Sequence, residues 1–141
     1  MSQIQVKIVD YSAYGEPIRH VREQVFIVEQ KVAKELEFDG LDPDCQHVIA
    51  FYDEEPVGTG RIQADGHIGR VAVLKEYRGK GVGNSIMKVL IQSARDSGQG
   101  SVWLSSQVNA KDFYKKLGFQ EYGEIYEEAG IDHIKMDLVF E

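Results

Sequence analysis

Cysteine, positive charge and long apolar runs are all scarce in this 141-residue chain, and each shortage excludes a class of protein. Cys45 is the single cysteine, so an internal disulfide and a thiolate metal cluster are excluded, which agrees with a reducing compartment. No apolar run reaches the roughly 18 to 20 residues that cross a bilayer, and the start of the chain lacks the layout of a signal peptide. We therefore expect a cytoplasmic protein with no membrane partner and no bound metal.

Lysine and arginine number 16 against 23 aspartates and glutamates, which leaves a formal net charge of −7. Binding to nucleic acid depends on clustered Lys and Arg that face phosphates, so a cationic or neutral substrate fits better than a nucleic-acid partner. With 43% hydrophobic and 28% charged residues, the chain has the composition of one ordinary globular domain. We expect residues 1–141 to form a single domain.

Apolar periodicity divides the chain into alternating strands and helices. The pattern predicts a strand at 4–8, a helix at 15–26 with Pro17 in its first turn, a loop with or without a second short helix at 31–45, a hairpin at 47–52 and 57–63, a buried strand at 67–74, a helix at 83–97, a strand at 101–108, a short helix that Asn109 caps, and a closing hairpin at 120–126 and 134–140. This order is α+β with a mixed sheet. Hairpins give antiparallel pairs, whereas the strand-helix-strand passage gives a parallel pair.

The stretch YRGKGVG, Tyr77 to Gly83, joins the buried strand to the following helix. Unpaired backbone N–H groups and the positive end of the helix dipole converge at such a turn, and phosphate oxygens satisfy them. The stretch is not a P-loop, because no glycine is followed by Lys and then Ser or Thr. It is not a dinucleotide fingerprint, because Asn84 replaces the third glycine and the next strand, SVWLSS, lacks the acidic residue that holds a ribose.

What remains is R-x-x-G-x-G, formed by Arg78, Gly81 and Gly83 between a strand and an amphipathic helix. Here the sequence resembles the GNAT superfamily of N-acetyltransferases, which has this motif in the same setting. A later stretch, NAKDFYKKLGF, resembles the second motif of the family, and VREQVFIVEQ with EFDGLD resembles a bacterial GNAT subgroup whose acceptors are mostly unassigned. The resemblance implies a mixed, mostly antiparallel sheet of about seven strands with a splayed central parallel pair, flanked by about four helices.

The resemblance also implies acetyl-CoA as cosubstrate. Its pyrophosphate would lie on backbone N–H groups of Arg78, Gly79, Lys80, Gly81, Val82 and Gly83. The strand before this loop would offer backbone groups and an apolar wall to the pantetheine arm and the thioester, through Val71, Ala72 and Val73. Asn109 would pair with the CoA arm, a role compatible with capping the short helix.

Acetyl transfer to an amine needs a donor to the oxyanion, an acid near the departing sulfur and a base for the ammonium. A backbone N–H near Val71 or Val73 is the candidate donor, and Tyr114 stands at the position of the tyrosine of the family, where it would act as the acid. The alternative role of Tyr114 is packing. The base is left open among five residues, of which His133 is the preferred candidate: His133, Glu29, Glu37, Asp39 and His67.

In the GNAT fold the first helix and the following loop line the acceptor side. The implied pocket residues are Arg22, Phe26, Glu29 and Gln30. The acidic segment 35–44 either attracts a cationic substrate or is an ordinary solvated loop, and we favour the loop. The expected activity is transfer of an acetyl group to a primary amine of a small molecule or peptide, by direct attack in a ternary complex. The alternative is a non-catalytic acyl-CoA sensor, and the sequence does not decide between a monomer and a homodimer.

Overall fold

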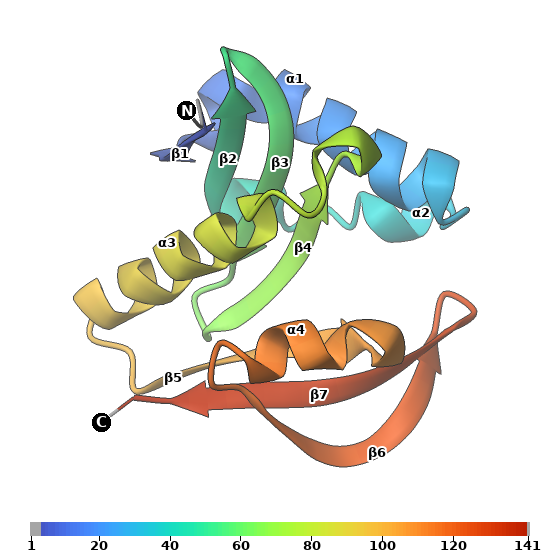
Figure 1. The fold of residues 1–141 in the computed structure, drawn as a ribbon, viewed down its shortest axis with the longest axis vertical. Helices are drawn as coiled ribbons and strands as arrows, with labels where there is room; N and C mark the ends of the chain where they lie inside the picture. The colour runs from blue at the N-terminus through green and yellow to red at the C-terminus, as the bar shows by residue number, and fades with distance from the viewer. Residues whose placement is uncertain (1–3, 141) are drawn as a thin grey trace.

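The computed structural model describes residues 4–140 as one seven-stranded sheet in the order β1-β2-β3-β4-β5-β7-β6 (Figure 1). The strands are β1 (Ile4–Val9), β2 (Gln46–Tyr52), β3 (Glu55–Ile62), β4 (His67–Val73), β5 (Ser101–Gln107), β6 (Gln120–Glu128) and β7 (Ile131–Val139). The α-helices are α1 (Tyr11–Arg22), α2 (Lys34–Glu37), α3 (Val82–Asp96) and α4 (Lys111–Lys115). Among the strands of residues 4–140, only β4 and β5 run parallel. The predicted mixed α+β sheet with one central parallel pair and four helices is therefore confirmed.

The helices pack on both faces of the sheet, with α3 and α4 in front of it in Figure 1 and α1 and α2 behind it. The larger core lies under α3, where Ile86, Met87 and Leu90 have no exposed surface. Their spacing along α3 matches the apolar stripe that predicted this helix. A smaller cluster joins Val21 and Val25 to Ala72 of β4 on the other face. No helix within residues 4–140 has the length and apolar character needed to cross a membrane.

The parallel pair β4 and β5 is joined at one end only. His67 pairs with Trp103 and Ile68 with Leu104, and the register stops there, so the strands separate towards their carboxyl ends. A bulge in β4, where the register with β3 shifts, adds to the irregularity. At the bulge Arg70 has a φ of 52°, a left-handed conformation that is uncommon for a side-chain-bearing residue and clusters at functional sites. The predicted splay of the central pair is thus present.

The first helix differs from its prediction at both ends. It begins at Tyr11, kinks at Tyr14 (φ −118°, ψ 15°), and continues beyond Arg22 as a π-helix, η1 (Glu23–Glu29). Pro17 is tolerated because the kink restarts the helix, which places the proline in a first turn whose N–H groups have no helical partner. The spacing of apolar residues in the sequence does not reveal a π-helix. Such segments are frequent at functional sites.

Asn109 does not cap the short helix, so that prediction is wrong. The chain leaves β5 and first tightens into a 3₁₀ turn, η4 (Val108–Ala110), and α4 then begins at Lys111 with Ala110 in the cap position. No side chain makes a cap hydrogen bond at either of these two described turns. Asn109 therefore lies inside the 3₁₀ turn, one residue before the position that a cap would need.

Candidate active site

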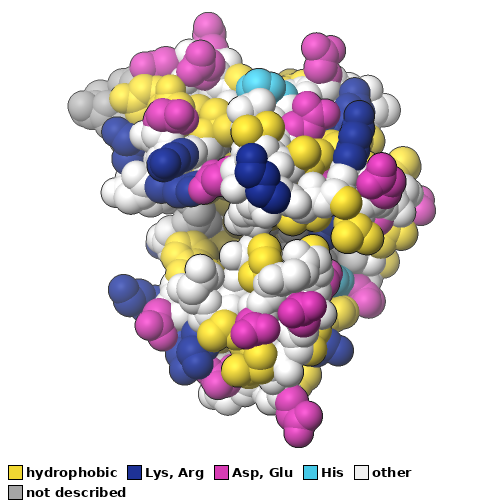
Figure 2. Space-filling model, turned by 90° about the vertical axis from the view of Figure 1, so that its right-hand side faces the viewer, with side chains coloured by type: hydrophobic (Ala, Val, Ile, Leu, Met, Phe, Trp, Pro, Cys, Tyr) yellow, Lys and Arg dark blue, Asp and Glu magenta, His cyan; other side chains and the backbone are white. Residues whose placement is uncertain are grey.

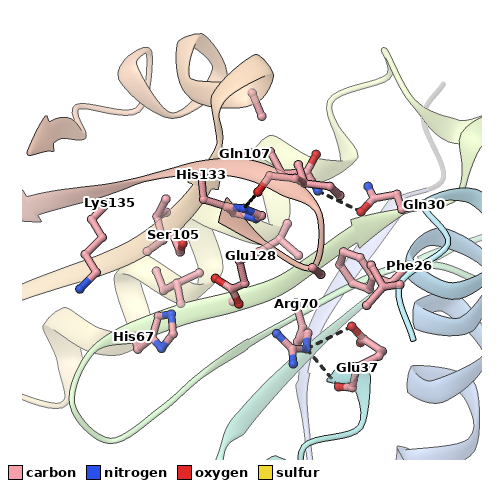
Figure 3. A pocket seen from close by; sticks show the side chains of 18 of the residues that line it. Phe26, Gln30, Glu37, His67, Arg70, Ser105, Gln107, Glu128, His133 and Lys135 are labelled. Atoms are coloured by element: carbon pink, nitrogen blue, oxygen red, sulfur yellow. Dashed lines mark hydrogen bonds and ion pairs between the residues drawn. The ribbon is translucent and has the colours of Figure 1, made fainter. Parts of the chain in front are cut away.

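A cavity of about 550 Å³ lies where β4 and β5 separate, and Figure 2 shows the surface hollowed between the two halves of the molecule. Its lining comes from both sides of the sheet. Phe26 and Gln30 reach it from η1 and the residue after it, and Tyr114 reaches it from α4. The side chain of Gln30 accepts a hydrogen bond of 2.9 Å from Gln107 of β5, so η1 and β5 meet across the gap (Figure 3). Two predicted acceptor residues, Phe26 and Gln30, therefore face one cavity.

The glycine turn places unpaired amides beside this gap. Gly79 and Gly81 have φ values of 76° and 83°, so glycine is required there for its left-handed backbone. The first helical hydrogen bond of α3 runs from the N–H of Ser85 to the carbonyl of Gly81. Within residues 4–140, the N–H groups of residues 81 to 84 donate to no backbone or side-chain acceptor. Four donors thus converge at the positive end of a 15-residue helix.

Arg78 holds this turn in place and does not present a free charge. Its guanidinium donates two hydrogen bonds, of 2.7 and 2.6 Å, to the carboxylate of Glu29, and its Nε donates to the carbonyl of Val73. The hydrogen bonds from Arg78 lower the pKa of Glu29, which makes Glu29 a poor base. Glu29 also lies outside the cavity lining. Its expected role as base or acceptor contact is corrected to that of an anchor for the glycine turn.

Tyr114 is half-buried, and it both packs and lines the cavity. Its ring meets Phe113 and Phe119 edge-on, with centroids 5.0 and 6.1 Å away. Burial raises the pKa of its hydroxyl to about 12. Among the described residues the hydroxyl has no hydrogen-bond partner, so it can still donate to a ligand. The two roles weighed for Tyr114 are therefore compatible.

Two histidines line the cavity with opposite tautomers. Nδ1 of His133 lies 2.7 Å from the carbonyl oxygen of Ile131, and because a carbonyl only accepts, Nδ1 carries the proton and the Nε2 lone pair stays free in the neutral ring. For His67 the amide of Gln63 donates to Nδ1 over 3.0 Å, so Nε2 carries the proton. Burial also lowers the pKa of His67. Of the two, only His133 has the geometry of a base.

A closed ring of ion pairs lies beneath the cavity. Three arginines alternate with three carboxylates, and the N to O distances run from 2.6 to 3.2 Å. In order around the ring these are Arg22, Glu37, Arg70, Asp39, Arg61 and Asp42. The ring joins α1, the acidic segment and strands β3 and β4, and its formal charges cancel. It therefore fixes the bulge of β4 against the segment that follows η1.

This ring corrects three expectations. Arg22 is 1% exposed and does not line the cavity, so it is a structural residue and not an acceptor contact. Although burial opposes the shift, the Arg61 guanidinium holds the pKa of Asp39 well below its usual range, which removes Asp39 as a base. Burial raises the pKa of Glu37, but both of its oxygens face arginines. The acidic segment is thus not simply a solvated loop.

The residues expected along β4 divide between the two faces. Val71 lines the cavity, and Val71 and Val73 pack against the core under α3. Ala72 is 3% exposed and packs against Val21 and Val25, so its side chain forms no wall for a ligand in the cavity. The bulge at Arg70 sets this alternation, because it adds one residue to the strand.

Four charged residues of the cavity were missed from the sequence: Arg61, Arg70, Glu128 and Lys135. A signal was available for the arginines, since each interrupts an otherwise apolar strand, and a charge at such a position is seldom buried unless it is paired. Glu128 and Lys135 had no such signal, because exposed charges are ordinary in a closing hairpin.

A helix start with unpaired amides beside a splayed parallel pair is the arrangement of N-acyltransferases with the GNAT fold. The family described as an acetyltransferase (GNAT) domain matches residues 9–140. The chain belongs to this family of acetyltransferases.

Individual relatives agree with that assignment. The chain is 40% identical over 121 residues to the uncharacterized N-acetyltransferase YjcF of Bacillus subtilis, which covers 83% of this chain and 86% of the relative. Its fold matches the crystal structure of ElaA of Escherichia coli with a TM-score of 0.83 and 31% identity, covering 95% of this chain and 98% of the other. An acyl-CoA N-acyltransferase of Pseudomonas aeruginosa matches with a TM-score of 0.84 and 29% identity, with the same coverage.

Proposed function

We propose that the protein transfers the acetyl group of acetyl-CoA to a primary amine of a small molecule or peptide, with both substrates bound at once. The observation that carries this proposal is the set of unpaired N–H groups at residues 81 to 84, which open beside the gap between β4 and β5. Anions bind at such helix starts. A cavity that reaches both sides of the sheet gives the two substrates separate approaches.

The residues present fit the donor. The amides of residues 81 to 84 would hold the diphosphate, and the edge of β4 beyond Ile68 would hold the arm, because β5 leaves that edge unpaired. Gly83 supports this fit. A Cβ built there would lie 3.5 Å from Phe113 and 3.7 Å from Val73, which are ordinary contacts, so the protein itself does not require glycine at this position. Close approach of a ligand to the backbone would require glycine at this position.

Each chemical task has a candidate residue. Acetyl-CoA supplies the acetyl group activated as a thioester. Nε2 of His133 would take the proton of the ammonium, directly or through water, because its lone pair is free in the neutral ring. A backbone N–H near Val71 would donate to the carbonyl oxygen as negative charge develops there. The hydroxyl of Tyr114 would donate to the departing sulfur, since a phenol with a raised pKa keeps its proton at neutral pH.

Replacing Gly83 with alanine is expected to weaken acetyl-CoA binding by tenfold or more while leaving the fold intact. Glycine inside a helix costs roughly 0.5 to 1 kcal/mol of stability relative to alanine, and the substitution removes this cost. The added methyl group meets only ordinary contacts inside the protein but blocks close approach of a phosphate. Calorimetry of CoA binding and urea unfolding measure the two effects. Unchanged affinity in Gly83→Ala would contradict the proposed diphosphate site.

Release of CoA thiol from acetyl-CoA with a panel of amines tests the activity itself. We expect release with at least one primary amine, and a fall in kcat of roughly tenfold in His133→Gln, since water can carry part of the proton transfer. The matched control is His20→Gln, an exposed histidine of α1 that lies outside the cavity. Saturable binding of acetyl-CoA without release for any amine would support the non-catalytic sensor instead.

A further inference from the structure

Two charged side chains of the cavity have no counter-charge. Glu128 of β6 and Lys135 of β7 both line the cavity, and within residues 4–140 neither side chain takes part in an ion pair or a hydrogen bond. The ammonium of Lys135 lies 5.8 Å from the centre of the Trp103 ring. Both side chains are exposed, so each is available to a ligand that enters from solvent.

The other full charges of the cavity are already neutralised. Glu37, Arg61 and Arg70 line it as well, but all three belong to the closed ring of three arginines and three carboxylates. Among the described residues that line the cavity, one negative charge and one positive charge therefore remain free for a ligand. This balance differs from that of the whole chain, whose net charge of −7 favours a purely cationic ligand.

The two free charges lie on either side of the proposed base. In the register of β6 and β7, Glu128 pairs with Ile131 and Tyr126 pairs with His133. Lys135 follows two residues after His133 on β7. Alternate residues of a strand share one face, so Ile131, His133 and Lys135 point to the same side of β7, and Figure 3 shows Glu128 next to His133 with Lys135 farther along the strand. Lys135 lies four residue steps beyond Ile131, about 13 Å along the strand. An ammonium beside Glu128 would be next to His133, with the rest of the ligand directed towards Lys135.

From this arrangement we infer that the acceptor is an amine that carries an anionic group, a carboxylate or a phosphate, several bonds from its nitrogen. Glu128 binds the ammonium next to His133, and Lys135 binds the anionic group. The distance between Glu128 and Lys135 favours such a molecule over an α-amino acid, whose two charged groups are close together. The positive charge of Lys135 disfavours a polyamine. This inference rests on the proposed function, of which it names the acceptor class.

Binding measured without turnover tests the inference separately from the activity. Calorimetry on the protein, alone and saturated with CoA, compares 6-aminohexanoate with n-hexylamine and with hexanoate, each of which lacks one of the two groups. O-phosphoethanolamine compared with ethanolamine tests the phosphate. We expect at least one amine with an anionic group to bind tenfold or more tightly than its matched analogues, and the better of the two identifies the anionic group.

Charge-removing variants locate the two contacts. Lys135→Met is expected to abolish the preference for 6-aminohexanoate over n-hexylamine, and Glu128→Gln the preference over hexanoate. The controls are Lys88→Met on the exposed face of α3 and Glu127→Gln on the neighbouring position of β6, neither of which lines the cavity, and both should retain the preferences.

Three results would overturn the inference: equal or tighter binding of n-hexylamine or spermidine, no measurable binding of either anionic amine, or preferences that survive in Lys135→Met and Glu128→Gln. Failure of the proposed function looks different. In that case the preferences persist in the binding experiment, but no amine releases CoA thiol from acetyl-CoA.

Discussion

Tyr114→Phe is expected to lower kcat by roughly 10²- to 10⁴-fold, the range for loss of a positioned acid or base. The change removes only the hydroxyl. Because that hydroxyl has no partner among the described residues, and because both phenylalanine contacts are made by the ring, the free energy of unfolding should change by less than about 0.5 kcal/mol. Steady-state kinetics with acetyl-CoA and a reactive amine, together with urea unfolding, measure the two quantities.

The outcome separates catalysis from packing at this residue. Tyr122→Phe is the matched control, since Tyr122 is 43% exposed on β6 and lies outside the cavity lining. If Tyr114→Phe retains the kcat of the wild type, Tyr114 is only a packing residue and the proton for the sulfur comes from elsewhere. If kcat falls together with affinity for CoA, the hydroxyl acts mainly in binding.

Arg22→Met should destabilise the fold by about 3 to 5 kcal/mol, the cost of breaking a buried ion pair by removal of one partner. Methionine fills much of the same volume, so the effect reports charge. Arg22 is 1% exposed and lies 2.6 Å from both Glu37 and Asp42, whose carboxylates would be left with fewer partners in a site away from water. Urea unfolding at neutral pH measures the loss.

The comparison for this variant lies one turn earlier in the same helix. Arg19 is exposed and its guanidinium contacts Tyr11 but no carboxylate among the described residues, so Arg19→Met should change stability by no more than about 1 kcal/mol. A loss in Arg22→Met as small as that in Arg19→Met would mean that the ring contributes little net stability. In that case the ring would matter mainly for the conformation of the bulge at Arg70.

The fold could be predicted from the sequence because its signals are local. Alternation of apolar residues marks β1, and the near-continuous run of β4 marks a strand covered on both faces. The turn between β4 and α3 could be read because Gly79 and Gly81 need a backbone conformation that few other residues adopt. These features depend on neighbours within a few residues, so one sequence is enough to show them.

The site could be predicted only in part, because it depends on pairs of residues that are far apart in the sequence. Arg22 and Asp42 are separated by 20 residues in the chain but share a hydrogen bond, and Arg78 and Glu29 by 49. No local pattern shows such partners, so the sequence predicts Arg22 in the pocket and Glu29 among the bases. The tautomer of His133 follows from the carbonyl of Ile131, which is likewise visible only once the β6–β7 turn is folded.

The limited contact between β4 and β5 has a mechanical consequence. With only two register pairs joining them, the three carboxyl-terminal strands hold to the other four mainly through the apolar layer beneath α3. An extended ligand that lies in the gap and hydrogen-bonds to both β4 and β5 would replace the interstrand hydrogen bonds that the two strands do not make with each other. A bound donor would then hold strands β1–β4 and strands β5–β7 together as one rigid body. Tighter binding of the donor would therefore make local separation of the two groups of strands less favourable.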